Sequence, residues 1–169
     1  MTEEGEFDPI GALRALVENE VQFVVIGGFG AALLGSPVVT FDLDICYATD
    51  DRNLRRLACA LDVLGAKLRG PDVPADLPFE PDERALALAD SFTFRTVAGP
   101  LDVLATPTGT RGFADLAAGA QPVDVGGFSV LVASVDDLIR MKTEADRPKD
   151  RFGLIHLRAL RRRLEERKD

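Results

Sequence analysis

The sequence predicts an α+β fold in which helices flank a mixed β-sheet and two further helices close the C-terminus. Short β-branched runs, such as VQFVVIGG at 21–28, end in glycine and predict buried strands that lead into turns. Apolar residues at helical spacing lie between and after these runs and predict the helices. Two pairs of neighbouring strand patterns are joined by short glycine-containing turns, which is typical of hairpins.

The first half of the chain alternates helices with strands. Asp8 and Pro9 open a helix well, as N-cap and first helical residue. The elements that follow are a strand at 21–28, a short helix at 29–35 and a second strand at 38–47. Asp50 or Asp51 then caps a helix whose leucines recur at helical spacing, at positions 54, 57, 61 and 64.

The second half begins with a proline-rich segment and ends with two helices. Four of the ten prolines fall in residues 70–84, which predicts a loop or lid. The next elements are a hairpin around the turn AGP at 98–100, the short helix FADLAAG at 113–119 and a hairpin around Gly126-Gly127. Ser134 then caps a helix that runs to about Ala145, and Pro148 starts the last helix.

Length and composition favour one domain in an aqueous compartment. The 169 residues are 46% apolar, which is enough for a single domain over 1–169, with its core at 20–110 and closing helices at 134–169. The acidic N-terminus lacks the basic start and apolar stretch of a signal peptide, and no apolar run has membrane-spanning length. We therefore expect a cytoplasmic protein without a membrane partner.

Few residue types are available for chemistry. The two cysteines, Cys46 and Cys59, form no metal-binding spacing and are expected to be reduced core residues. The single histidine, His156, argues against a histidine-based metal site or a serine–histidine triad. Chemistry would have to rest on carboxylates, lysine, arginine or backbone groups.

Charge is distributed unevenly along the chain. The net charge is −8, but residues 1–139 carry −13 and residues 140–169 carry +5. A basic C-terminal segment is either a solvated helix or a surface for an anionic substrate such as a nucleic acid.

Three aspartates interrupt apolar strand patterns. In VVTFDLDICY (38–47), Asp42 and Asp44 point to the same face of a strand, and two like charges there need neutralisation. Such a pair suits a hard divalent cation such as Mg²⁺, unless one aspartate lies at a solvated strand end. Asp102, in PLDVLAT, also faces away from its apolar neighbours and could complete a site for two metal ions. Alternatively, it accepts a hydrogen bond, for example from Arg95.

Two further segments could contact phosphate. Gly27-Gly28 lies where a strand meets a helix, a position that lets backbone approach a phosphate, although a plain tight turn also fits. Lys142 borders the inward face of its helix, or extends along it to solvent. Asp150 suits the first turn of the last helix, or turns inward to orient Lys142 or Arg147.

In this order the motifs resemble the polymerase-beta-type (minimal) nucleotidyltransferase superfamily. The resemblance rests on GG, a D-x-D that begins fourteen residues after the second glycine, LDVLATP, and DLIRMKTEADRPKD. The resemblance covers about residues 20–160. Within the superfamily, the sequence is similar to a small bacterial branch related to abortive-infection and toxin–antitoxin nucleotidyltransferases.

The resemblance implies transfer of a nucleoside monophosphate from an NTP to a hydroxyl acceptor, with release of pyrophosphate. The implied cofactor is Mg²⁺, as two ions, with Mn²⁺ as the alternative. The implied partners are the NTP, a tRNA or protein acceptor, and a cognate antitoxin or other partner protein.

The resemblance also assigns roles to individual residues. The implied metal ligands are Asp42, Asp44 and Asp102, and Asp102 assists deprotonation of the acceptor. The implied nucleotide contacts are Gly27, Gly28, Thr40, Lys142 and Arg147. Asp150 matches the acid of the closing helix and is counted with the catalytic set.

The sequence departs from the superfamily pattern at two places. Leu34 stands where many relatives carry a histidine, and Val38-Val39 stands where they carry an arginine. Both departures favour an alternative reading, a catalytically degenerate module that binds an NTP or a partner protein.

A second alternative is a haloacid-dehalogenase-type phosphatase, which also has D-x-D after an apolar strand. That chemistry needs a mobile loop directly after the motif and a later acidic motif at a strand end. Here Ile45-Cys46-Tyr47 continues the strand pattern, and Asp136-Asp137 belongs to a helix start.

Overall fold

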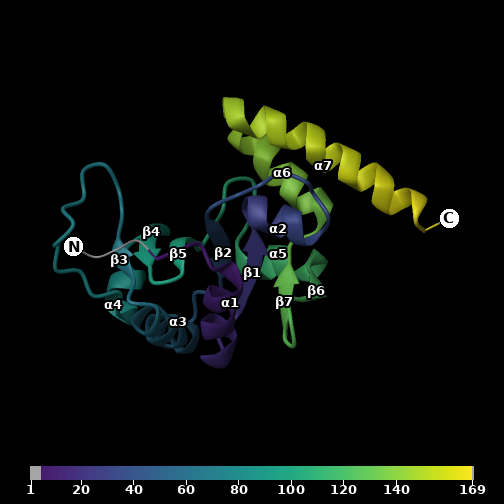
Figure 1. The fold of residues 1–169 in the computed structure, drawn as a ribbon. Helices are drawn as coiled ribbons and strands as arrows, with labels where there is room; N and C mark the ends of the chain where they lie inside the picture. Colours follow the sequence, from purple (N-terminus) through teal and green to yellow (C-terminus); the bar gives the residue numbers. More distant parts are fainter. Residues whose placement is uncertain (1–4, 169) are drawn as a thin grey trace.

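The centre of the molecule is a mixed β-sheet, seen in a computed structural model that describes residues 5–168 (Figure 1). Its seven strands are β1 (Phe23–Ile26), β2 (Leu43–Tyr47), β3 (Lys67–Leu68), β4 (Ser91–Thr96), β5 (Gly99–Leu104), β6 (Gln121–Asp124) and β7 (Ser129–Val132). They are arranged in the order β3-β4-β5-β2-β1-β7-β6. The pairs β2–β5 and β1–β7 are parallel, and the other neighbours are antiparallel. The predicted α+β fold with a mixed sheet is confirmed.

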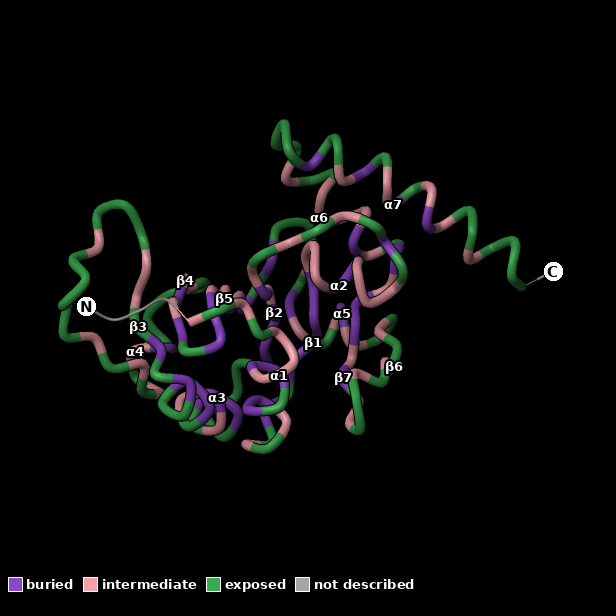
Figure 2. The backbone as a smooth tube through the Cα atoms, viewed as in Figure 1, coloured by how far each residue is buried: buried purple, intermediate pink, exposed green. Residues whose placement is uncertain are grey.

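Helices cover the sheet on both sides. Within residues 5–168 they are α1 (Pro9–Glu18), α2 (Gly27–Leu33), α3 (Asp51–Val63), α4 (Glu83–Leu86), α5 (Phe113–Gly119), α6 (Val135–Ala145) and α7 (Pro148–Glu166). In Figure 1, α6 and α7 lie together at one end of the molecule, and the distal half of α7 extends past the other elements. Most residues in that distal half are exposed (Figure 2).

The predicted helix starts are confirmed by their capping hydrogen bonds. The Asp8 carboxylate accepts from Gly11 N at 3.0 Å at the start of α1. Asp50, rather than Asp51, caps α3 by accepting from Asn53 N. At the start of α6, the Ser134 hydroxyl accepts from Asp137 N at 3.0 Å. Each bond satisfies one of the backbone N–H groups that the first helical turn leaves unpaired.

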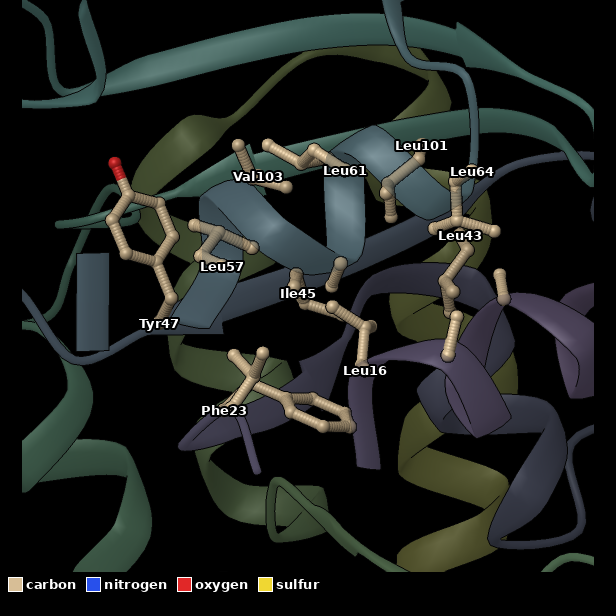
Figure 3. Close-up of a cluster of buried hydrophobic side chains, with 14 of the residues drawn as sticks. Leu16, Phe23, Leu43, Ile45, Tyr47, Leu57, Leu61, Leu64, Leu101 and Val103 are labelled. Carbon is tan, nitrogen blue, oxygen red and sulfur yellow. The ribbon is translucent and has the colours of Figure 1, made fainter. Parts of the chain in front are cut away.

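Two apolar clusters fill the two faces of the sheet. The larger lies between the sheet and α1 with α3, and Figure 3 shows part of it, including Leu16, Ile45 and Leu57. The smaller lies between the other face and α5, α6 and α7, around Cys46 and Leu116. Side chains alternate between these clusters along each central strand, as the twofold repeat of a strand requires.

This alternation places two of the aspartates on one face. In β2, Leu43, Ile45 and Tyr47 enter the larger cluster, so Asp44 faces the side of the smaller one. In β5, Leu101 and Val103 enter the larger cluster, and Asp102 takes the same side as Asp44. The parallel register pairs Asp44 directly with Asp102.

The predicted strand at 38–47 begins too early. β2 starts only at Leu43, and Asp42 lies in the loop before it. The reason is a lack of partners, because β1 ends at Ile26, opposite Asp44, and the chain then turns into α2. The segment before Leu43 is instead partly solvent-facing, with Val39 and Phe41 about three-quarters exposed.

Three smaller expectations also need correction: the start of α2, the extent of the loop at 70–84 and the burial of Cys59. Helix α2 begins at Gly27, two residues before the predicted start. The strand β3 and the one-turn helix α4 are too short to give a sequence pattern, and α4 shortens the loop predicted at 70–84. Cys46 is buried as expected, but Cys59 is exposed on α3.

Among residues 5–168, no helix combines the length and apolar character needed to cross a membrane.

Candidate active site

A cleft of about 630 Å³ opens between the sheet and the paired helices α6 and α7. It brings together side chains from the ends of β1, β2 and β5, from the loop before β2, and from both helices. All nine residues that the sequence singled out line it: Gly27, Gly28, Thr40, Asp42, Asp44, Asp102, Lys142, Arg147 and Asp150. A second cavity of about 490 Å³, beside the end of α3, contains none of them.

Three carboxylates converge at the floor of this cleft. Asp42, Asp44 and Asp102 each present one oxygen, and these oxygens all lie within 4.8 Å of one another. Asp44 and Asp102 meet because their strands are paired in register. Asp42 reaches them from the loop, where the Thr40 hydroxyl donates to Asp42 Oδ1 at 2.8 Å. Thr40 therefore orients a carboxylate in this structure.

Crowding of these acids changes the protonation of Asp44. Burial, followed by the negative charges of Asp42 and Asp102, raises the pKa of Asp44 from its usual 3.8 to about 8. A hydrogen bond from the Asp44 carboxyl to Asp102 acts in the same direction, and the positive charge of Lys149 acts against it. The cluster is thus short of positive charge. An oxygen-only donor set of this kind fits a hard divalent cation such as Mg²⁺.

Asp102 does pair with an arginine, but the predicted partner is wrong. Arg69 Nη2 lies 3.4 Å from Asp102 Oδ1, whereas Arg95 donates to the backbone oxygen of Ala75 in the proline-rich loop. The register explains the difference, because Arg95 pairs with Pro100 and Thr93 is the residue opposite Asp102.

The glycine pair makes room for these groups. Gly27 has a φ of +68°, and a Cβ built on it would lie 2.2 Å from Asp44 Oδ2. A Cβ on Gly28 would lie 3.2 Å from Thr40 Cβ. A side chain at 27 would therefore meet both a strained backbone and a collision with the carboxylate.

Positive charge enters the cleft from α6 and α7. Lys142, Arg147 and Lys149 all line it. Asp150, fully buried, holds the first two: Arg147 Nε lies 2.8 Å from Asp150 Oδ2, and Lys142 Nζ lies 3.5 Å from Oδ1. Burial acts to raise the pKa of Asp150, but hydrogen bonds from the side chain and backbone of Arg147, with both positive charges, hold it below its usual value.

Solved structures of similar shape include a nucleotide-transferring enzyme. The lincosamide antibiotic adenylyltransferase LnuA, solved with lincomycin, superposes with a TM-score of 0.62 at 14% identity, over 92% of this chain and 99% of that one. A Thermotoga maritima protein thought to be a nucleotidyltransferase gives 0.51 at 16% identity, over 98% and 99%. The antibiotic-resistance factor ANT(2″)-Ia gives 0.51 at 17% identity, over 95% and 90%. No family model and no curated protein matches the sequence.

The chain has the polymerase-beta-type nucleotidyltransferase fold. The structure gives no support to the phosphatase alternative. β2 continues through Tyr47 after the D-x-D, and Asp137 lies in the first turn of α6, where its N–H is capped by Ser134.

Two residues in this nucleotidyltransferase fold were missed from the sequence. Lys149 was not assigned a role, yet it lines the cleft and its positive charge acts to lower the pKa of Asp44. Its position directly before Asp150 was the available signal. Arg69 left no signal, because its contact with Asp102 depends on the order of β3, β4 and β5.

The structure also shows what surrounds the two departures from the superfamily pattern. Leu34 follows α2 and packs against both apolar clusters. Val38 and Val39 line the cleft without contributing charge. The cations that line it are Lys142 on α6, Lys149 on α7, and Arg147 in the two-residue link between these helices.

Replacing Asp150 by Asn should destabilise the protein, because Lys142 and Arg147 would lose their buried counter-charge. Since both cations are partly exposed and can be solvated, we expect a cost of about 2 kcal/mol, or about 5 °C in Tm. Asp146→Asn, which breaks an exposed pair with Arg151, is the matched control and should change Tm by less than about 1 °C. Equal Tm values for the two variants in thermal unfolding would contradict the role given to Asp150.

Proposed function

We propose that this protein is a Mg²⁺-dependent nucleotidyltransferase that moves a nucleoside monophosphate from an NTP to a hydroxyl acceptor. One observation carries the proposal: in a chain of this fold, a cluster of three carboxylates and three cations line the same cleft. Carboxylates alone would suit many cations, and cations alone would suit many anions. Both together suit a metal-bound triphosphate.

The carboxylates would hold the metal. Asp42 and Asp44, with Asp102 beside them, offer closely spaced oxygen ligands. Bound there, Mg²⁺ would supply Lewis-acid charge to phosphoryl oxygens. Thr40 keeps Asp42 oriented by its hydrogen bond, and Gly27 leaves the space that the Asp44 carboxylate occupies.

The remaining residues would bind the nucleotide and move a proton. Lys142, Arg147 and Lys149 bind the triphosphate oxygens, and Asp150 fixes the first two of these side chains. Asp102 accepts the proton of the acceptor hydroxyl. The hydroxyl oxygen then bonds to the α-phosphorus, the bond from that phosphorus to the bridging oxygen breaks, and pyrophosphate leaves.

The acceptor that we favour is a hydroxyl of tRNA or of a protein, which would place the enzyme in a toxin–antitoxin or related system. The net charge of +5 on residues 140–169 supports an anionic acceptor such as tRNA. Residues 1–139 carry −13 and would repel such an acceptor, so it would have to bind at the basic segment. A small hydroxyl-bearing compound is the second candidate. It is favoured by the similar structures, which include a lincosamide adenylyltransferase and ANT(2″)-Ia with adenylyl-2″-tobramycin.

Transfer assays with each α-labelled NTP test the proposal. The acceptors are total tRNA, cell lysate, lincomycin and tobramycin, each incubated with Mg²⁺ or with EDTA. We expect Mg²⁺-dependent labelling of one acceptor by the wild type, and none by Asp42→Ala/Asp44→Ala. Labelling that persists in the double variant would refute the assigned site. No labelling of any acceptor would favour the degenerate module. A Mg²⁺–NTP shift in Tm would then indicate its NTP-binding form, and an unchanged Tm its partner-binding form.

A further inference from the structure

Two of the three clustered aspartates are contacted by a side chain from outside the cluster. Asp42 accepts a hydrogen bond from the Thr40 hydroxyl. Asp44 lies beside Asp102 in the parallel pairing of β2 and β5. Asp102 is contacted by the Arg69 guanidinium at 3.4 Å. Among the described residues, Arg69 is the single cation that forms an ion pair with any of the three.

The pairing of β3, β4 and β5 determines which carboxylate the Arg69 side chain can contact. Its backbone N–H donates to Thr93 O at 2.9 Å, just after the short strand β3. Thr93 lies opposite Asp102 in the β4–β5 pairing. The Arg69 side chain therefore crosses β4 from its own backbone anchor to reach a carboxylate on β5. Arg69 thus approaches Asp102 from the β3 edge of the sheet.

Among the described residues, Arg69 is the one side chain outside the three aspartates that forms a hydrogen bond with the Asp102 carboxylate. This contact therefore fixes where that carboxylate lies. Outer contacts of this type orient ligands and catalytic carboxylates in metal sites.

We propose that Arg69 is a positioning residue that holds Asp102 toward the acceptor hydroxyl while the metal occupies Asp42 and Asp44. The inference rests on the proposed function. It assigns Arg69 no contact with the NTP, because Arg69 does not line the cleft. A loss of Arg69 should therefore slow the chemical step without weakening nucleotide binding.

Arg95 provides a matched control. It lies on the neighbouring strand β4, its side chain is also partly buried, and its Nε, like that of Arg69, has no hydrogen-bond partner. It differs in what its guanidinium contacts, since it bonds the backbone oxygen of Ala75 and none of the three acids. Arg69→Met and Arg95→Met thus remove the same group at neighbouring sites, and only the first removes a contact with Asp102.

The kinetic test compares Arg69→Met, Arg69→Lys and Arg95→Met with the wild type, using the labelled NTP and acceptor that the wild type accepts. We expect kcat of Arg69→Met to fall by about 10- to 100-fold, with KM for the NTP unchanged within about twofold. Arg69→Lys should recover part of kcat, and Arg95→Met should stay within about twofold of the wild type. A wild-type kcat for Arg69→Met, or an equal loss in Arg95→Met, would overturn the inference.

A second test needs no activity. The Tm of metal-free protein is compared for the wild type, Arg69→Met, Asp102→Asn and the double variant, as a double-mutant cycle. We expect Arg69→Met to lower Tm by about 2 °C in the wild-type background and to have no effect when Asp102 is already Asn. Equal shifts in both backgrounds would show that the two side chains are not coupled. An inactive wild type would instead overturn the proposed function, and this cycle separates the two failures.

Discussion

Asp44→Asn should raise the stability of the metal-free protein and abolish its activity. The raised pKa of Asp44 means that folding favours the protonated carboxyl, so the wild type loses stability as the pH rises from about 4 through about 8. An amide at position 44 cannot ionise and avoids this loss. At pH 8.5 we expect the variant to unfold about 3 °C or more above the wild type, and its transfer rate to fall on the order of 10³-fold.

Thermal unfolding between pH 5 and pH 9, with and without Mg²⁺, measures both parts of this prediction. Mg²⁺ should raise the Tm of the wild type at high pH and leave that of Asp44→Asn unchanged. Asp62→Asn, on α3 at the opposite face of the sheet from Asp44 and Asp102, is the control and should follow the wild type. A wild-type Tm that does not decline toward pH 9 without metal would contradict the crowding of the three acids.

Gly27→Ala should inactivate the site through Asp44. The new Cβ would lie 2.2 Å from Asp44 Oδ2, so the carboxylate has to move. Because displacement of a catalytic group by about 1 Å can cost about 10²-fold, we expect a loss of that order in transfer rate. The Mg²⁺-dependent shift in Tm should shrink with it, since the metal ligands no longer converge.

Gly65→Ala separates this collision from backbone strain. Gly65 has a φ of +60°, close to the +68° of Gly27, and its Cβ would meet only Val97 Cγ1 at 3.6 Å, an ordinary contact. Both variants should lose stability by about 1–2 kcal/mol from the left-handed backbone. Only Gly27→Ala should lose activity. Comparable activity losses in the two variants would mean that backbone strain, and not the collision with Asp44, explains the need for glycine at position 27.

Local patterns predicted most elements of the fold. Ser134 and Asp8 were identified as caps because a single side chain decides such a helix start. β5 and its outward Asp102 followed from the alternation around Leu101 and Val103. These inferences depend only on residues close in sequence, and the structure confirms each of them.

Features that depend on pairing between distant segments were harder to predict. The strand pattern at 38–47 ignored that β1 ends at Ile26, so Asp42 was placed on a strand when it lies in a loop. Arg95 was named as a partner of Asp102 because it lies across the hairpin. The chain turns at Val97-Ala98, and the resulting register places Thr93, and not Arg95, opposite Asp102. Arg69 could not be found at all without the strand order.

The central claim is that the three carboxylates hold a divalent cation beside a triphosphate that the cations of α6 and α7 bind. A crystal grown with Mn²⁺ and a non-hydrolysable NTP analogue, measured at an X-ray energy where Mn²⁺ scatters anomalously, tests it most directly. We predict an anomalous peak in contact with Asp42 and Asp44, and triphosphate density within hydrogen-bonding distance of Lys142 or Lys149. Nucleotide bound elsewhere, or bound in this cleft with no Mn²⁺ at the aspartates, would contradict the account.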